Sequence, residues 1–260
     1  MTPAPAPAGI PQTRPGLDSR TRCDYDREAM NRDQHPAPEL LEAALDRLPL
    51  FPLPNAVLFP GVVLPLHLFE PRYRALAEHC VAGHRLMALG TLRPGYEQDY
   101  EGRPPIFPIL TVGQIAAERR HPDGRWDIAL RGLTRVELVD EHPPSEPFRL
   151  IKVKKVRDLE RVSDRLAGEH LRSAVIQVAN QIPALWPQLS PQLIAARTPG
   201  LLADVVAGTF IESPMVRRSL LEELVVAKRI ELLQESMAQI LLDIALRARS
   251  DADRPREPLN

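Results

Sequence analysis

An apolar stretch interrupted by prolines, residues 48–69, is the sequence feature that most constrains the fold. It reads LPLFPLPNAVLFPGVVLPLHLF, has 22 residues and carries no formal charge. That length would suffice for a membrane helix. However, each proline removes a backbone N–H and clashes with the preceding turn, so no helix can run through the stretch. A lone strand cannot span a bilayer, because its backbone polar groups would be unpaired. The stretch is therefore predicted to form buried strands.

Two strands are predicted within it, over residues 48–53 and 62–69. Between them, Pro60 and Gly61 suit the two central positions of a type II turn, because proline presets the first φ and glycine accepts the positive second φ. Pro65 cannot donate to a sheet ladder. It indicates an edge position, a bulge or a break in the second strand.

Helices are predicted on both sides of this stretch. Residues 38–47 form a short helix with proline at its start. A second helix begins at Glu70 and Pro71 and ends near Gly83. Its apolar side chains recur at helical spacing and should face the core. They are Tyr73, Leu76, Ala77 and Cys80.

More strands are predicted further along the chain. They cover residues 85–92, 109–118, 126–131, 135–140 and 148–156. Asp123 and Gly124 indicate a hairpin turn before the third of these, and Gly132 allows a tight turn or a bulge after it. About six strands with one inserted helix predict a small, twisted β-barrel.

From Asp158 the apolar pattern changes to a helical period. Pro183 and Pro187 should break the first helix, and a second should open at Ser190 and Pro191. A third is predicted over residues 201–210. A long terminal helix starts at Ser213 and Pro214 and runs to about residue 249, with a break near Leu224. Its stripe of Val226, Ile230, Leu233, Met237, Ile240 and Ile244 predicts internal packing, with a homodimer seam as the alternative.

The predicted fold class is therefore α+β, with a small β-barrel of about six strands and one inserted helix, followed by a helical bundle with a long C-terminal helix. Four parts are expected along the chain. They are a Pro/Ala-rich disordered tail over residues 1–37, a barrel over 38–157, a bundle over 158–249 and a polar tail over 250–260.

Composition narrows the function classes. The chain has 33 Lys plus Arg against 34 Asp plus Glu, so net charge gives no general attraction to nucleic acid or anionic membranes. Two cysteines, Cys23 and Cys80, cannot build a disulfide scaffold. The N-terminus MTPAPAPAGI lacks the basic and apolar regions of a signal peptide. A cytoplasmic location is expected.

Catalytic and metal-binding motifs are absent from the sequence. The dipeptide Gly-Lys never occurs, which excludes a P-loop, and no Gly-x-Ser-x-Gly, His-Glu-x-x-His or Cys-x-x-Cys is present. His79, Cys80 and His84 come nearest to a metal cluster, but Gly83 should end their helix and a fourth ligand is missing. We therefore predict no metal, no cofactor and no catalytic residue.

Basic residues gather in the predicted strands. They are Arg119, Arg120, Arg125, Arg131, Arg135, Lys152, Lys154 and Lys155. Such a face could bind RNA phosphates. No stacking aromatics are interleaved with these residues, so solvated strand faces are the preferred interpretation.

The segment LPLFPLPNAVLFPGVVLPLHLFEPRYRAL closely resembles the start of the N-terminal, substrate-binding domain of Lon proteases. The matching motifs are residues 48–52, 58–61 and 65–73. Weaker resemblance continues through Val112-Gly113-x-Ile115, Asp123-Gly124-Arg125 and Leu130-x-Gly132-x-x-Arg135, and through residues 201–210 and 220–233. In all it covers about residues 47–245.

The resemblance implies a PUA-like barrel followed by helices, and recognition of polypeptides without catalysis. The Lon ATPase and Ser-Lys protease modules have no counterpart in this sequence, so a stand-alone binding protein is expected. Its implied partners are unfolded polypeptides, a protease or a chaperone. A PUA-like RNA-binding protein is the alternative. The candidate contact residues are Pro60, Leu64, Phe69, Glu70, Arg72 and Tyr73. Glu70 and Arg72 are assigned first to structure, as a first-turn carboxylate and its partner.

Overall fold

The computed structural model of the chain describes residues 36–252, except for the side chains of Gln188 and residues 247–252. These residues divide into two compact units. The first holds the described residues up to Arg157 together with Glu212–Glu222, and the second holds Asp158–Ile211 and the described residues from Glu223. The predicted tails therefore lie outside the described residues, apart from residues 36–37 and 250–252.

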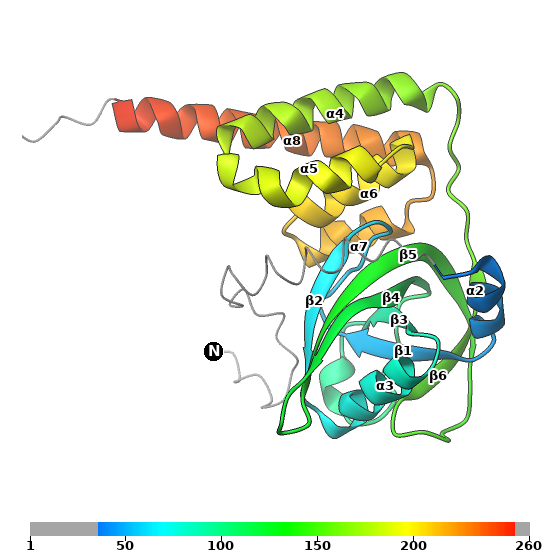
Figure 1. Cartoon of the computed structure of the whole chain (residues 1–260). Helices are drawn as coiled ribbons and strands as arrows, with labels where there is room; N and C mark the ends of the chain where they lie inside the picture. The colour runs from blue at the N-terminus through cyan, green and yellow to red at the C-terminus, as the bar shows by residue number, and fades with distance from the viewer. Residues whose placement is uncertain (1–35, 253–260) are drawn as a thin grey trace, which may run out of the picture. The chain divides into compact units, whose positions relative to one another are not determined.

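Six strands form the sheet of the first unit. In chain order they are β1 (Leu48–Leu53), β2 (Val63–Leu68), β3 (Leu86–Thr91), β4 (Ile109–Arg120), β5 (Trp126–Glu141) and β6 (Arg149–Lys155). Their order in the sheet is β2-β5-β4-β3-β1-β6, with an additional β5–β6 pairing, and only β1 and β3 run parallel. The sheet therefore curls strongly (Figure 1). Among the described residues β2 pairs with β5 alone, which leaves an open edge, so the sheet is better described as a partly open barrel than as a closed one.

Three helices belong to this unit, α2 (Pro38–Ala44), α3 (Pro71–Ala82) and α7 (Pro214–Glu222), with a short 3₁₀ helix, η1 (Tyr96–Asp99). α3 begins as the sequence predicts, with Glu70 as its N-cap residue and Pro71 in the first turn, and its C-cap is Gly83. The four side chains predicted to face the core are its buried ones. They pack with Phe51, Leu53 and Met87.

Alternating residues of the central strands serve two separate cores. Phe51 and Leu53 of β1 join the cluster under α3, whereas Leu48 and Leu50 join a second cluster that includes Ala44 of α2. All six residues of β1 are consequently buried. Strands covered on both faces read as continuous apolar runs, which is why the sequence of β1 lacks polar alternation.

The chain between β1 and β2 is buried without being a strand. Phe59 and Val62 close the predicted turn through a backbone hydrogen bond of 3.1 Å, and Gly61 has a φ of 78°. Buried carbonyls need partners. Thr91 and Thr111 donate their hydroxyls to the carbonyls of Ala56 and Leu58, at 2.8 and 2.6 Å. Two buried threonines thus hold an irregular segment inside the core.

β5 continues through the position where the sequence allowed a turn or a bulge. Gly132 pairs with Gly113 while Thr134 pairs with Val112, so Leu133 is the extra residue of a bulge. β2 occupies the edge of the sheet, one of the positions that Pro65 indicated, and Pro65 lies opposite Ala129.

Helices make up the second unit: α4 (Asp164–Gln181), η2 (Pro183–Leu185), α5 (Trp186–Ala195), α6 (Pro199–Phe210) and α8 (Val226–Ala252). Within this unit α4 runs beside α8 (Figure 1). The first four members of the terminal stripe, Val226 to Met237, are at most 1% exposed, whereas Ile240 and Ile244 are half-buried. Internal packing is thus confirmed for that first part.

Three details of the helical prediction need correction. α5 begins at Trp186, not at Ser190, and it runs through Pro191 at the cost of one i→i−4 hydrogen bond. The predicted bundle of residues 158–249 included α7, which instead groups with the sheet unit. α8 continues to Ala252, beyond the end expected near residue 249. The predicted break near Leu224 is confirmed, because α7 ends at Glu222 and α8 begins at Val226.

Candidate functional site

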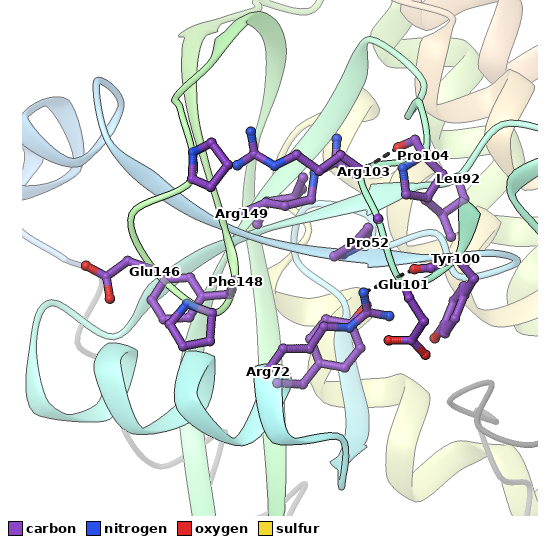
Figure 2. Close-up of a pocket in the computed structure, with 15 residues that line it drawn as sticks. Pro52, Arg72, Leu92, Tyr100, Glu101, Arg103, Pro104, Glu146, Phe148 and Arg149 are labelled. Atoms are coloured by element: carbon purple, nitrogen blue, oxygen red, sulfur yellow. Dashed lines mark hydrogen bonds between the residues drawn. The ribbon is translucent and has the colours of Figure 1, made fainter.

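A cavity of about 230 Å³ in the first unit is the candidate site. Three stretches distant in sequence meet there: the start of α3, the segment after η1, and the segment that leads into β6 (Figure 2). Residues of β1 and Leu92 complete the lining. The lining residues are Leu50, Pro52, Arg72, Tyr73, Leu92, Tyr100, Glu101, Gly102, Arg103, Pro104, Pro144, Glu146, Pro147, Phe148 and Arg149.

Arg72 is held on one side of the cavity by several contacts. Its Nε donates to Glu70 at 3.0 Å. Its Nη1 donates to the carbonyl of Tyr100 at 3.1 Å, a bond that Figure 2 marks. The guanidinium also lies over the rings of Tyr73 and Tyr100, at 4.7 and 4.9 Å. Its Nη2 is buried and has no hydrogen-bond partner among the described residues. The cation is fixed in position and retains one unused donor.

Glu70 completes this arrangement, because its second carboxylate oxygen accepts the hydroxyl of Tyr100 at 2.9 Å. Burial raises the pKa of Glu70, although Tyr100 and Arg72 act in the opposite direction. Burial also raises the pKa of Tyr73 to about 12. Glu70 and Arg72 therefore form the pair that the structural assignment expected.

A second arginine cluster holds the opposite wall. Arg149 makes two hydrogen bonds of 2.7 Å to Glu141 and donates to the carbonyl of Pro104 at 2.8 Å. Arg103 donates to the carbonyl of His142 at 2.9 Å and lies 3.4 Å from Glu141. Paired arginine–carboxylate bonds fix side chains well. They tie the segment after η1 to the segment before β6.

Between these walls the lining is largely apolar. Pro52, Leu92 and Phe148 are buried, whereas Pro144 and Pro147 are exposed beside the cavity. Glu101 and Glu146 are also exposed beside the cavity. The cavity thus offers an apolar floor, prolines without N–H donors and both signs of charge at its margin.

The predicted contact residues separate into two groups. Arg72 and Tyr73 line the cavity. Glu70 accepts hydrogen bonds from two lining residues, Arg72 and Tyr100. Pro60, Leu64 and Phe69 are not among the lining residues: Pro60 is buried in the turn, Leu64 lies on the edge strand, and Phe69 is half-buried after it.

Sequence reasoning missed Tyr100, Arg103, Phe148 and Arg149. Tyr100 and Arg103 lie in the segment RPGYEQDYEGRPP, whereas Phe148 and Arg149 begin the predicted strand of residues 148–156, directly after EHPPSEP. No pattern in these two connecting segments indicates that they meet. A signal was present, since both are rich in proline and one carries two tyrosines.

The basic strand residues are mostly paired with acids. Lys152 contacts Asp46 at 2.6 Å, Lys154 contacts Glu137 at 2.9 Å, and Lys155 contacts Glu42. Arg135 is 3% exposed and donates to the carbonyl of Leu221 at 2.9 Å, so it does not belong to a solvated strand face. Pairing with carboxylates reduces the positive potential that phosphate binding requires.

Two of the three residues that come nearest to a metal cluster in the sequence, Cys80 and His84, form hydrogen bonds with the backbone. The Cys80 thiol donates to the carbonyl of Leu86 at 3.4 Å, and the Leu86 N–H donates to Nδ1 of His84 at 3.0 Å. Burial raises the pKa of Cys80 to about 12, which disfavours the thiolate that metals bind.

Residues 47–239 match the family described as the ATP-dependent protease La (LON) substrate-binding domain. The chain belongs to this family. Among its relatives, Lon protease of Desulfosudis oleivorans is 26% identical over 190 residues, which cover 72% of this chain and 23% of the relative. Lon protease 2 of Myxococcus xanthus is 29% identical over 192 residues, with 72% and 23% covered. The chain thus spans about a quarter of the length of these curated relatives.

Solved structures show the same fold as this LON substrate-binding domain. The N-terminal domain of Mycobacterium avium complex Lon protease matches with a TM-score of 0.59 and 16% identity, covering 74% of this chain and 98% of that one. A Lon N-terminal domain protein from Xanthomonas campestris matches with a TM-score of 0.51 and 22% identity, covering 73% and 97%. Within residues 36–252, no helix is long and apolar enough to cross a membrane.

Proposed function

We propose that this chain is a non-catalytic recognition module that holds an extended segment of a substrate polypeptide in the cavity between α3, the segment after η1 and the segment before β6. Membership of a family described as substrate-binding supports binding of polypeptides. The composition of the cavity is the observation that carries the choice of site.

The lining suits a polypeptide in extended form. An apolar floor accepts a side chain, and binding sites commonly combine such a floor with a few fixed polar groups. Arg72 supplies one such group, because its buried Nη2 has no hydrogen-bond partner among the described residues and could donate to a backbone carbonyl. A volume of about 230 Å³ accommodates one or two side chains rather than a folded domain.

Recognition without cleavage is the second part of the proposal. The sequence lacks the Gly-x-Ser-x-Gly nucleophile motif, and the polar groups of the cavity are bonded to neighbouring side chains: Glu70 to Arg72 and Tyr100, and Arg149 to Glu141. A hydrolase needs a nucleophile beside a base. None of these pairs has that form.

Binding can be measured by fluorescence anisotropy with a fluorescein-labelled, permanently unfolded probe, reduced and carboxymethylated α-lactalbumin. Pro144→Asp places a charge on a lining residue that is exposed and forms no backbone N–H bond. Pro143→Asp places the same charge one residue away, on an exposed residue outside the lining. We expect Pro144→Asp to weaken binding about tenfold, equivalent to ~1.4 kcal/mol, and Pro143→Asp to have little effect.

Three results would count against the proposal. Equal binding of the probe by both proline variants would show that the cavity is not the binding site. Loss of binding on Leu64→Asp with normal binding by Pro144→Asp would move the site to the exposed edge strand β2, where a peptide could add as a further strand. Cleavage of the probe by the purified chain, abolished by a single substitution, would make the module catalytic.

A further inference from the structure

Two histidines and one aspartate converge on the sheet unit, away from the cavity. Nδ1 of His67 lies 2.5 Å from one carboxylate oxygen of Asp127, and Nε2 of His121 lies 2.6 Å from the other. One ligand atom from each of the three residues falls within 4.8 Å of the other two. Neither histidine was singled out by the sequence, because 54 residues separate them.

Backbone pairing fixes where these side chains start. His67 on β2 is directly opposite Asp127 on β5, so the two side chains share a face of the sheet. His121 begins the β4–β5 turn, whose backbone closes through bonds of 2.8 Å from His121 to Arg125 and 2.9 Å from Gly124 to His121. The site is therefore carried by a strand pair and a tight turn, which hold ligands better than a long loop does.

The spacing of the ligand atoms suits a small transition-metal ion. Zinc takes imidazole nitrogen and carboxylate oxygen at about 2.0–2.2 Å, which places neighbouring ligand atoms about 3.3 Å apart in a tetrahedron. The two His–Asp distances, 2.5 and 2.6 Å to different carboxylate oxygens, are hydrogen-bond distances and shorter than this ligand spacing, whereas the 4.8 Å limit on all pairs is longer than it. Small side-chain rotations would bring the three atoms onto one ion.

Access and charge also suit an ion. The side chains of His67, Asp127 and His121 are 37%, 14% and 25% exposed, which leaves a path from solvent. The site also supplies one carboxylate beside two imidazoles, ligand types that zinc accepts. Nearby, Arg125 is paired with Asp123 at 2.6 Å.

We propose that His67, His121 and Asp127 bind one divalent transition-metal ion of the zinc class. Two imidazoles with one carboxylate favour Zn²⁺, Co²⁺ or Ni²⁺ over Mg²⁺ and Ca²⁺, which prefer oxygen ligands throughout. Three protein ligands leave a fourth tetrahedral position for water or for a donor from a partner. The proposal is independent of polypeptide binding in the cavity.

The test has two titrations of the full chain. Co²⁺ binding is monitored by visible absorption, and Zn²⁺ binding is measured by calorimetry. His67→Ala and His121→Gln each remove one ligand. His79→Ala is the matched control, since His79 is an exposed histidine of the same unit outside the triad. Thermal melting with and without Zn²⁺ gives an independent measurement, because an ion that binds only the native state raises the midpoint.

We expect one saturable site with tetrahedral Co²⁺ absorption in the wild type and in His79→Ala. Each ligand variant should weaken binding by at least the roughly 10–100-fold that loss of a supporting residue costs, and should lose the zinc-dependent rise in melting midpoint. Unchanged affinity in both ligand variants would overturn the proposal. So would a folded wild type that shows no saturable binding, which would leave a hydrogen-bonded His–Asp–His triad and no metal site.

Discussion

Arg229 of α8 provides the sharpest prediction about stability, because its charge is almost completely enclosed. The residue is 1% exposed. Its guanidinium bonds to both carboxylate oxygens of Asp158, one of them at 3.0 Å, and donates to the carbonyl of Glu223 at 3.0 Å. A second carboxylate, Asp204, lies 3.8 Å from its Nε. One guanidinium in the second unit therefore interacts with several acceptors that have little or no contact with solvent.

Arg229→Met keeps the apolar stem but removes the charge. The charge of Asp158 would be tolerated without the guanidinium, because a quarter of its side chain is exposed to solvent. Asp204 has 2% side-chain exposure, so its buried negative charge would lose part of the positive charge that stabilises it. Removal of one partner from a buried ion pair costs about 3–5 kcal/mol. That is a large part of the ~5–15 kcal/mol that stabilises a typical domain.

Urea unfolding monitored by circular dichroism measures the loss, with Arg165→Met as the control on an exposed arginine of the same unit. We expect the control to stay within about 0.5 kcal/mol of wild type. Adding Asp204→Leu to Arg229→Met should recover part of the loss, because it removes the enclosed anion. An Arg229→Met chain within 1 kcal/mol of wild type would refute this account of the buried charge.

Three further predictions concern the sheet unit. Gly132→Ala should destabilise it by at least ~1–3 kcal/mol in urea unfolding, because the new Cβ would lie 2.1 Å from the carbonyl oxygen of Phe59, a backbone atom; a smaller loss would show that the turn shifts freely. In a Cys23→Ser background, Cys80 should react with a thiol reagent at pH 8 only after unfolding, since burial raises its pKa to about 12, and prompt reaction of the native chain would contradict this. Because burial raises the pKa of Tyr73 to about 12, wild type and Tyr73→Phe should show equal phenolate absorbance at pH 10.5 while folded; one additional phenolate in wild type would disprove it.

Local elements were predictable where proline and glycine determine the backbone. Pro71 in the first turn and the spacing of Tyr73, Leu76 and Cys80 define α3, and its observed start and buried face agree. Pro60 and Gly61 define the turn before β2 in the same way. In each case the controlling residues lie within one or two turns of each other, so tertiary contacts had little to change.

Pairings between distant segments were not predictable. Nothing in the sequence indicated that β1 runs parallel to β3 or that it also pairs with β6. The cavity depends on such pairings, since Arg149 reaches Pro104 only because β6 lies next to β1. Arg72 and Tyr73 came from a family motif, whereas Phe148 belonged to an unremarkable strand start. For the same reason the contact between His67 and Asp127 was not predictable, because it depends on the pairing register of β2 with β5.

The return of residues 212–222 to the sheet unit has a practical consequence for anyone who divides this protein. A fragment that stops at residue 157 would lose α7, and with it the carbonyl of Leu221 that accepts from Arg135 and the guanidinium of Arg217 that serves the carbonyl of Val57. Arg135 and the carbonyl of Val57 would each lose that hydrogen bond. The sheet unit is discontinuous in sequence, and a workable minimal version would need a linker that joins residue 157 to residue 212.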